Sequence, residues 1–225
     1  MRGCVFDLDG TLVNTLPTVH HYCNLSLAHF GFCSIAEDEC RKLCRLPIAS
    51  FYHRLLQLGG CPEERIEELA PEIRDYDLAI YLKDFQYLTR PYPAIPGLLR
   101  ELRERRAVLA VLTNKPAPVA ESLMESLFPG MFDIVRGQTP ETISKPDPRS
   151  LWNLLDDLGL AREECVYVGD TDVDMETAQN TGMDCMLVSW GFREAEALMR
   201  LAPRYLVSDP AEMPALILQP VEDMD

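Results

Sequence analysis

Basic residues are scarce in this sequence of 225 residues, in which 21 lysines and arginines stand against 36 aspartates and glutamates, for a net charge of −15. Nucleic acids and anionic membrane surfaces are therefore not expected as partners, because both carry dense negative charge. Long apolar runs are also absent, and no segment has the length of a membrane-spanning helix. Because no cleavable leader precedes the first predicted strand, we expect a cytoplasmic protein. The sequence contains no internal repeat and no low-complexity segment.

The eight cysteines do not suggest a disulfide framework, because several of them lie within apolar patterns, as small core residues do. We expect reduced thiols. Cys40 and Cys44 have the spacing that places two thiols on one helix face, but no second pair completes a zinc site. The length suits one large domain, or a domain with an insertion, and a hydrophobic content of 47% supplies a core.

The segment from about 15 to 90 reads as helices alone. Apolar residues at helical spacing predict helices at 18–30, 37–45, 48–58 and 62–88, with Pro71 as a candidate break in the last. The proline-rich segment 90–97 then ends this helical block.

The rest of the chain alternates between strands and helices. Strands are predicted at 3–6, 107–112, 132–135, 165–168 and 184–188, and helices at 96–105, 116–127, 147–158 and 172–181. This alternation predicts an α/β fold, a Rossmann-like parallel sheet flanked by helices. Its core comprises 1–14 and 91–225, and the helical domain 15–90 is inserted after the first strand.

Ligands of open parallel sheets bind outside the carboxyl ends of the strands. The inserted helical domain begins and ends beside that edge, so it can act as a lid over a site there. The alternative is a separately packed helical domain with no role in the chemistry.

Two carboxylates, Asp7 and Asp9, follow the first strand directly, and Gly10 permits a sharp turn after them. Residues at i and i+2 leave a strand on the same face or close to it. Two like charges held this close are costly unless a cation lies near them. A strand followed by a plain Asp-Gly turn is the structural alternative.

Further polar residues follow later strands. Thr113 ends one strand, Lys145 precedes a helix between prolines, and Asp170 and Asp174 lie at the start of another helix. Each has an ordinary structural explanation when it is considered alone: Thr113 can terminate a strand, Lys145 can be a solvated surface charge, and an aspartate at a helix start can cap the helix. Capping does not require several carboxylates over one turn, so the acidic group is better explained by a cation site.

The energies favour a bound cation. Two carboxylates about 4 Å apart repel each other by roughly 4 kcal/mol at an effective dielectric constant near 20. If Asp7, Asp9, Asp170 and Asp174 converge, the repulsion approaches the stability of a whole domain. A divalent cation offsets it, and hard oxygen ligands favour Mg²⁺. Lys145 offsets a further negative charge.

In this order, these residues resemble the four sequence motifs of the haloacid dehalogenase-like hydrolases. The motifs correspond to 7–11, Thr113, Lys145 and Gly169-Asp170-x-x-x-Asp174. Segments 92–97, 113–116 and 144–148 look like the phosphoglycolate phosphatase branch, which also includes pyrophosphatases and phosphoglucomutases. The resemblance spans the chain, and it implies that 15–90 is the family's α-helical cap domain.

The resemblance also implies roles for individual residues. Asp7 attacks phosphorus and forms an aspartyl-phosphate, and Asp9 acts as general acid and then as general base. Mg²⁺ is held by the Asp7 carboxylate, the Asp9 backbone carbonyl and Asp170.

Four further residues complete the implied site. Thr113 and Lys145 contact the transferring phosphoryl group, and Asn114 offers its backbone N–H to the phosphate. Asp174 steadies Lys145 or a water on the metal.

The implied activity is Mg²⁺-dependent hydrolysis of a small phosphorylated metabolite, with 2-phosphoglycolate as the best candidate. A pyrophosphatase or a phosphomutase of the β-phosphoglucomutase type is the alternative, and in a mutase Arg45 or Lys42 would contact a second phosphate. A non-catalytic binding protein would be expected to lack the nucleophile or a metal ligand. We expect residues of the helical domain within 36–60 to select the leaving group. We expect the protein to be a monomer or a homodimer.

Overall fold

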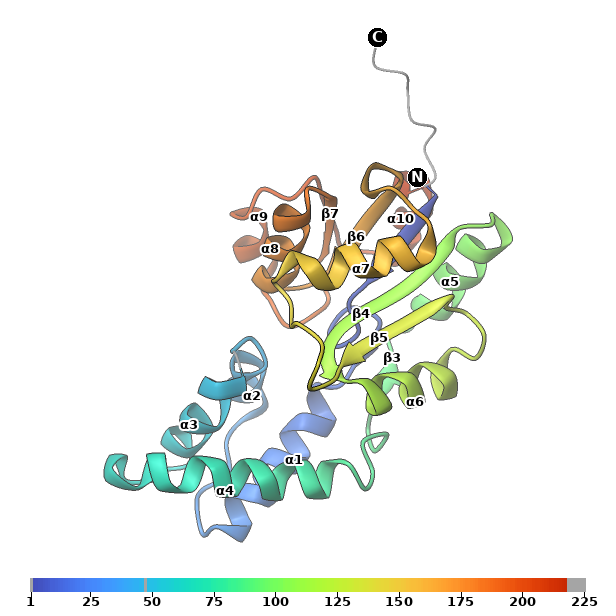
Figure 1. Ribbon diagram of the computed structural model, residues 1–225. Coiled ribbons are helices and arrows are strands. Elements are labelled where there is room, and N and C mark those ends of the chain that lie inside the picture. Colours follow the sequence, from blue (N-terminus) through green and yellow to red (C-terminus); the bar gives the residue numbers. More distant parts are fainter. Residues whose placement is uncertain (1, 47, 218–225) are drawn as a thin grey trace. The chain divides into compact units, whose positions relative to one another are not determined.

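The computed structural model describes residues 2–46 and 48–217 (Figure 1). The chain divides into two compact units, one formed by Met1–Asn14 with Arg90–Asp225 and the other by Thr15–Thr89. We call them the sheet unit and the helical unit. Among the described residues, no helix combines the length and the apolar character required to cross a membrane. None of the eight cysteines forms a disulfide.

The sheet unit is built on a parallel sheet, as the sequence predicts. Over the described residues its six strands have the order β5-β4-β1-β6-β7-β8, and all neighbours pair in parallel. Their bounds are Gly3–Phe6 for β1, Val108–Pro116 for β4, Ile134–Gln138 for β5, Cys165–Gly169 for β6, Asp184–Val188 for β7 and Tyr205–Val207 for β8. The first strand is therefore central, and the residues that follow it lie in the middle of the sheet's carboxyl edge.

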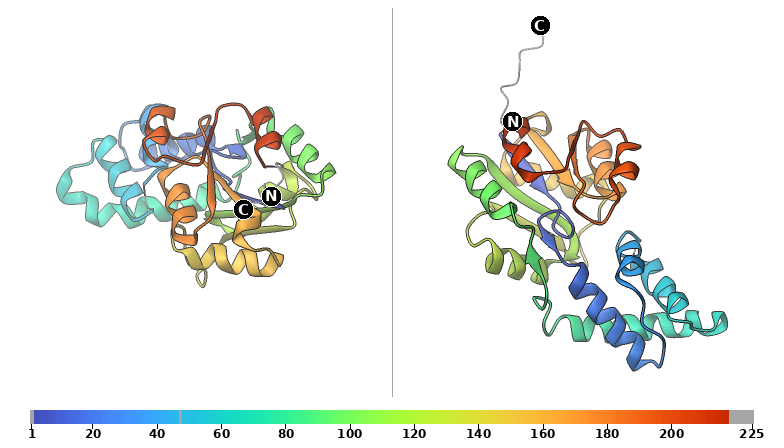
Figure 2. Two further views of the ribbon diagram at one scale, coloured as in Figure 1. Left: turned by 90° about the horizontal axis from the view of Figure 1, so that it is seen from above. Right: turned by 180° about the vertical axis from the view of Figure 1, so that it is seen from behind.

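Helices cover both faces of this sheet (Figure 2). The helices α5 (Ile95–Glu104), α6 (Ala117–Leu127) and α10 (Met213–Ile217) lie on one face, and α7 (Pro148–Leu158) and α8 (Asp172–Thr181) lie on the other. A short helix, α9 (Ala195–Met199), and two 3₁₀ turns, Arg162–Glu164 and Pro210–Glu212, complete the unit. This two-sided cover explains why the central strands read as continuous apolar runs.

The core follows from this arrangement. All four residues of β1 are buried. Val5 packs in a cluster with Leu151, Leu154 and Ala178 of α7 and α8. Each fully buried aliphatic side chain of this kind contributes roughly 1.5–3 kcal/mol. The site therefore stands at the edge of a well-packed core.

Several short elements were not expected from the sequence. The strand β8 and the helices α9 and α10 lie beyond the last predicted strand, and β2 (Val13–Asn14) pairs in antiparallel fashion with β3 (Arg90–Pro91). Elements of two to five residues are too short to show a periodicity. The β2–β3 pair joins the two points at which the chain leaves and re-enters the sheet unit.

The described helices of the helical unit are α1 (Leu16–His29), α2 (Glu37–Leu43), α3 (Ile48–Leu58) and α4 (Glu63–Tyr81). The α4 helix runs unbroken through Pro71 and ends seven residues earlier than predicted. Side chains of α1 explain the early end, because Tyr22 and Thr18 donate to the carbonyls of Asp84 and Tyr87. These carbonyls therefore have partners outside a continued helix.

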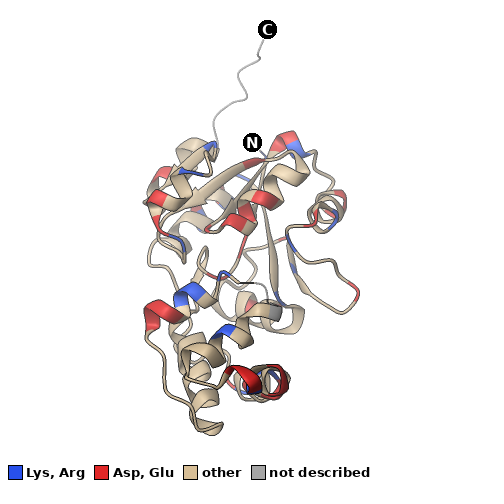
Figure 3. Ribbon diagram, turned by 90° about the vertical axis from the view of Figure 1, so that its left-hand side faces the viewer, with Lys and Arg blue, Asp and Glu red and all other residues tan. Residues whose placement is uncertain are grey.

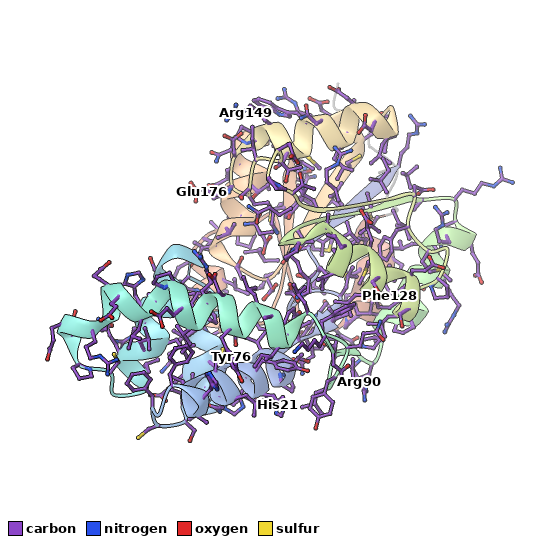
Figure 4. All side chains as sticks on the ribbon, turned by 60° about the horizontal axis from the view of Figure 1, so that its bottom comes forward. His21, Tyr76, Arg90, Phe128, Arg149 and Glu176 are labelled. Carbon is purple, nitrogen blue, oxygen red and sulfur yellow. The ribbon has the colours of Figure 1, made fainter. Side chains whose placement is uncertain are left out.

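Aromatic side chains pack within the helical unit. Phe51 and Tyr52 of α3 are buried. The ring of Tyr76 on α4, labelled in Figure 4, stacks on His29 of α1 with ring centroids 3.9 Å apart. These three aromatic residues thus contribute to packing inside the unit.

Candidate active site

The first predicted motif lies directly beyond β1, at the centre of the sheet's carboxyl edge. The Asp7 backbone N–H donates to the Val168 carbonyl at 2.8 Å, which extends the pairing of β1 with β6 by one residue. Gly10 then turns the chain with a φ of +85°, in the left-handed region that favours glycine. A Cβ at this position would lie 2.3 Å from Asp170 Oδ2. Gly10 therefore provides the turn and also leaves room for a carboxylate.

Four buried charged side chains meet at this edge, and we call Asp7, Lys145, Asp170 and Asp174 the charge cluster. The Lys145 Nζ atom lies 2.8 Å from Asp7 Oδ1 and 2.8 Å from Asp174 Oδ1. It also lies 3.0 Å from the hydroxyl of Tyr167, a buried residue of β6. Lys145 thus joins Asp7, which follows β1, to Asp174 of α8.

The two later aspartates are held by hydrogen bonds. Asp174 Oδ2 accepts from the backbone N–H groups of Asp170 and Thr171 and from the Thr171 hydroxyl. Asp170 accepts from the Thr11 hydroxyl at 2.9 Å and from the Phe192 N–H at 2.7 Å. Hydrogen bonds from the protein itself therefore hold both carboxylates in position.

The charge cluster carries an excess of negative charge. One carboxylate oxygen from each of Asp7, Asp170 and Asp174 lies within 4.8 Å of the others, and with all three ionised, one lysine would leave two negative charges uncompensated. Burial raises the pKa of Asp7 to about 7, although Lys145 lowers it, and Asp174 raises it further. Burial likewise raises the pKa of Asp170 well above its usual range. A divalent cation with a preference for hard oxygen ligands fits this donor set.

Acidic residues outside the charge cluster include many that are exposed to solvent. The α4 helix carries a row of acidic residues, drawn red in Figure 3, and those at Glu63, Glu64, Glu67, Glu68 and Glu72 are exposed to solvent. Exposed carboxylates are hydrated and screened by salt, so they need no bound ion. The carboxylates of the buried charge cluster are shielded from this hydration and salt screening.

The side chain of Asp9 pairs with a lysine outside the charge cluster. Its two carboxylate oxygens lie 3.0 and 3.2 Å from the Nζ atom of Lys115, at the end of β4. The carboxylate is therefore not part of the three-aspartate group, and metal binding through the Asp9 backbone carbonyl stays a prediction.

The predicted residues of the second motif also have clear partners. Thr113 is buried, and its hydroxyl accepts the Lys115 backbone N–H at 3.2 Å. The Asn114 side chain donates to the Lys145 carbonyl at 3.1 Å and accepts from the Lys145 N–H at 2.8 Å. The Asn114 amide thus holds the loop that carries Lys145, and phosphate binding by its backbone N–H stays a prediction.

Arg45 belongs to the helical unit, in the turn after α2, and is half-buried. Its contact with a substrate stays a prediction. Two residues with direct contacts to the site, Lys115 and Tyr167, were missed by sequence reasoning. A lysine two residues after the Thr113 strand end was a signal for the first. A tyrosine inside an apolar strand, whose hydroxyl needs a buried partner, was a signal for the second.

Comparison with known proteins shows which families and folds this chain resembles. A family model described as haloacid dehalogenase-like hydrolase matches residues 4–188. The phosphoglycolate phosphatase of Yersinia pseudotuberculosis serotype I (strain IP32953) is 28% identical over 227 residues, which cover 100% of this chain and 97% of that protein. The phosphoglycolate phosphatase of Cereibacter sphaeroides (strain ATCC 17029 / ATH 2.4.9) is 32% identical over 219 residues, with coverage of 96% and 98%.

Solved structures extend the likeness to three dimensions. A haloacid dehalogenase-like hydrolase from Streptococcus pneumoniae superposes with a TM-score of 0.83 at 28% identity, over 96% of this chain and 98% of that chain. The fold is thus similar over nearly the whole chain.

Proposed function

Because this chain belongs to the haloacid dehalogenase-like hydrolases and is a phosphatase, we propose that it hydrolyses phosphomonoesters with Mg²⁺ through an aspartyl-phosphate. The observation that carries the proposal is the contact of Lys145 with Asp7 at 2.8 Å inside a buried group of three aspartates. Burial raises the pKa of Asp7 to about 7, and the Lys145 ammonium group opposes this rise, so Lys145 favours the ionised form that a nucleophile requires.

The donor set supports a magnesium site. Two carboxylates, Asp7 and Asp170, together with the backbone carbonyl of Asp9, are the proposed ligands. When bound, Mg²⁺ supplies electrostatic stabilisation to the oxygens of the transferring phosphoryl group. Asp174 accepts hydrogen bonds at both oxygens, so we assign it to positioning Lys145 and the loop of Asp170.

In the first half-reaction an Asp7 oxygen attacks phosphorus, the bond from phosphorus to the ester oxygen breaks, and Asp9 gives its proton to the leaving oxygen. Lys145 and Thr113 contact the oxygens of the transferring group. In the second half-reaction a water attacks the aspartyl-phosphate and its proton passes to Asp9. The bond between phosphorus and the Asp7 oxygen breaks, which releases inorganic phosphate and restores both aspartates.

The proposed substrate is 2-phosphoglycolate. The names of the two bacterial relatives support it, at 28% and 32% identity over essentially the whole chain. We further propose that the helical unit, 15–90, acts as a cap domain that selects the leaving group, with Arg45 as a substrate contact. The core chemistry recognises only the phosphoryl group, so selection requires residues outside it.

Phosphate release from a panel of esters tests the proposal. The panel holds 2-phosphoglycolate, sugar phosphates, nucleoside monophosphates and pyrophosphate, each with Mg²⁺ and with EDTA, and the Asp7→Asn variant is the blank. We expect release to be highest from 2-phosphoglycolate and to vanish with EDTA and in the variant. Preference for pyrophosphate, or isomerisation of β-glucose 1-phosphate without net release, would refute the proposed activity.

A further inference from the structure

Lys115 forms a bidentate ion pair with Asp9 that the proposed mechanism leaves unexplained. Its Nζ atom lies 3.0 and 3.2 Å from the two Asp9 oxygens, and the side chain of Lys115 is only 7% exposed, against 25% for Asp9. A lysine that merely solubilised the surface would extend into water. This lysine instead lies against the residue that is proposed to protonate the leaving oxygen.

The backbone around Lys115 fixes this position. The pairing of β4 with β5 is irregular between Leu112 and Pro116, so residues 113–115 leave the regular ladder at the carboxyl edge of the sheet. The Lys115 N–H donates to the hydroxyl of Thr113, which ties Lys115 to the proposed phosphoryl contact. Such irregularities re-aim side chains beside binding sites.

The two lysines of the site therefore have different neighbours. Lys145 contacts Asp7, the proposed nucleophile, whereas Lys115 contacts Asp9, the proposed general acid. A general acid must come within about 2.6–3.2 Å of the oxygen that it protonates. Because Lys115 lies one hydrogen-bond length from Asp9, its ammonium group would lie within about 6 Å of a leaving oxygen that contacts the same Asp9 oxygen.

We propose that Lys115 determines specificity by binding the carboxylate of the leaving group while it orients Asp9. The inference rests on the proposed function, because 2-phosphoglycolate carries its carboxylate one methylene beyond the ester oxygen. An ammonium group has three N–H donors on a rotatable bond, so it can hold Asp9 and contact a second anion together. A charge-assisted contact of this kind favours a carboxylated leaving group over a neutral one.

A pair of substrates isolates this effect. We would measure kcat and KM for 2-phosphoglycolate and for 2-hydroxyethyl phosphate, which has a neutral hydroxymethyl group in place of the carboxylate. The variants are Lys115→Gln and Lys115→Arg, and the control is Lys83→Gln, an exposed lysine of the helical unit. Any loss that arises from misorientation of Asp9 affects both esters and cancels in the ratio of their kcat/KM values.

The wild type should prefer 2-phosphoglycolate, and Lys115→Gln should reduce that preference at least about tenfold, mainly through a higher KM for the carboxylated ester. Lys115→Arg should restore part of it, and Lys83→Gln should leave it unchanged. A wild type that prefers 2-phosphoglycolate and keeps its preference in Lys115→Gln would overturn this inference alone. A wild type that cleaves both esters equally would refute the proposed substrate, and the inference with it.

Discussion

At the scale of single residues, the charge cluster depends on side chains that do no chemistry themselves. The Tyr167 hydroxyl contacts Lys145 at 3.0 Å and Asp174 at 3.2 Å, and it also reaches the Leu112 carbonyl at 3.4 Å. It is buried with these groups, so its hydrogen bonds are made at a low effective dielectric constant and fix the lysine firmly.

Tyr167→Phe should therefore lower kcat about fivefold to tenfold with little change in KM, because Lys145 keeps both carboxylates but loses a fixed partner. Steady-state kinetics with 2-phosphoglycolate measure the effects on kcat and KM separately. Tyr205→Phe on the edge strand β8 is the control and should behave as wild type. Equal losses in both variants would contradict a positioning role for Tyr167.

Gly10 and Gly31 give a matched pair of substitutions. Both have positive φ, +85° and +80°, but a Cβ at Gly10 would collide with Asp170 Oδ2 at 2.3 Å, whereas nothing lies within 4 Å at Gly31. Both alanine variants carry similar backbone strain, on the order of 1 kcal/mol. We expect Gly10→Ala alone to lose activity, by about 100-fold or more. Comparable activity in the two variants would show that the contact with Asp170 is unimportant.

At the scale of elements, Asp77 of α4 joins three helices inside the helical unit. Its carboxyl group accepts from Ser26 of α1 at 2.8 Å and from Tyr52 of α3 at 3.0 Å. Burial raises the pKa of Asp77, although both hydrogen bonds lower it in part. The folded state consequently holds the proton more tightly than the unfolded state.

The sign of the resulting pH dependence follows from linkage. Because the pKa of Asp77 is higher in the folded state, its bound proton stabilises the folded state at pH values below the unfolded-state pKa near 4. This stabilisation is lost as the pH rises through the folded-state pKa. Asp77→Asn removes the titration, so the stability of the variant relative to the wild type should increase as the pH rises from 4 to 7.5. Urea unfolding of both proteins across this range measures the difference, and a difference independent of pH would contradict the assignment.

Features marked by local sequence patterns could be predicted, whereas features that depend on partners distant in sequence could not. The bounds predicted for α3, α8 and β7 agree with the structure, because a glycine follows each of the two helices and β7 is a short apolar run. The strand β8 and the early end of α4 depend on partners distant in sequence. The Lys115–Asp9 pair depends on an irregularity in the β4–β5 pairing, which no local pattern reports.

At the scale of the whole molecule, the fold holds a surplus of buried negative charge that a cation can relieve. With the pKa of Asp7 raised to about 7, the protonated form stabilises the metal-free protein at low pH, and this contribution is lost as the pH rises through 7. Above that pH the ionised carboxylates repel one another unless a cation is bound.

Mg²⁺ should therefore raise the melting temperature more at pH 8 than at pH 5, because at pH 5 the cation must displace protons from the carboxylates. Thermal unfolding with Mg²⁺ or EDTA at both pH values measures this difference without any substrate. Asp170→Asn should abolish the Mg²⁺ effect. A shift of equal size at both pH values would contradict a site made of these carboxylates.

The central claim is that Asp7 carries the phosphoryl group during turnover. The most direct measurement is to quench the enzyme during turnover of 2-phosphoglycolate, reduce it with borohydride, and sequence the peptide that contains Asp7 by mass spectrometry. An acyl phosphate at Asp7 is reduced to homoserine, and we expect this change only when substrate and Mg²⁺ are both present. Rapid turnover with an unmodified Asp7, or with the modification at another carboxylate, would contradict the account.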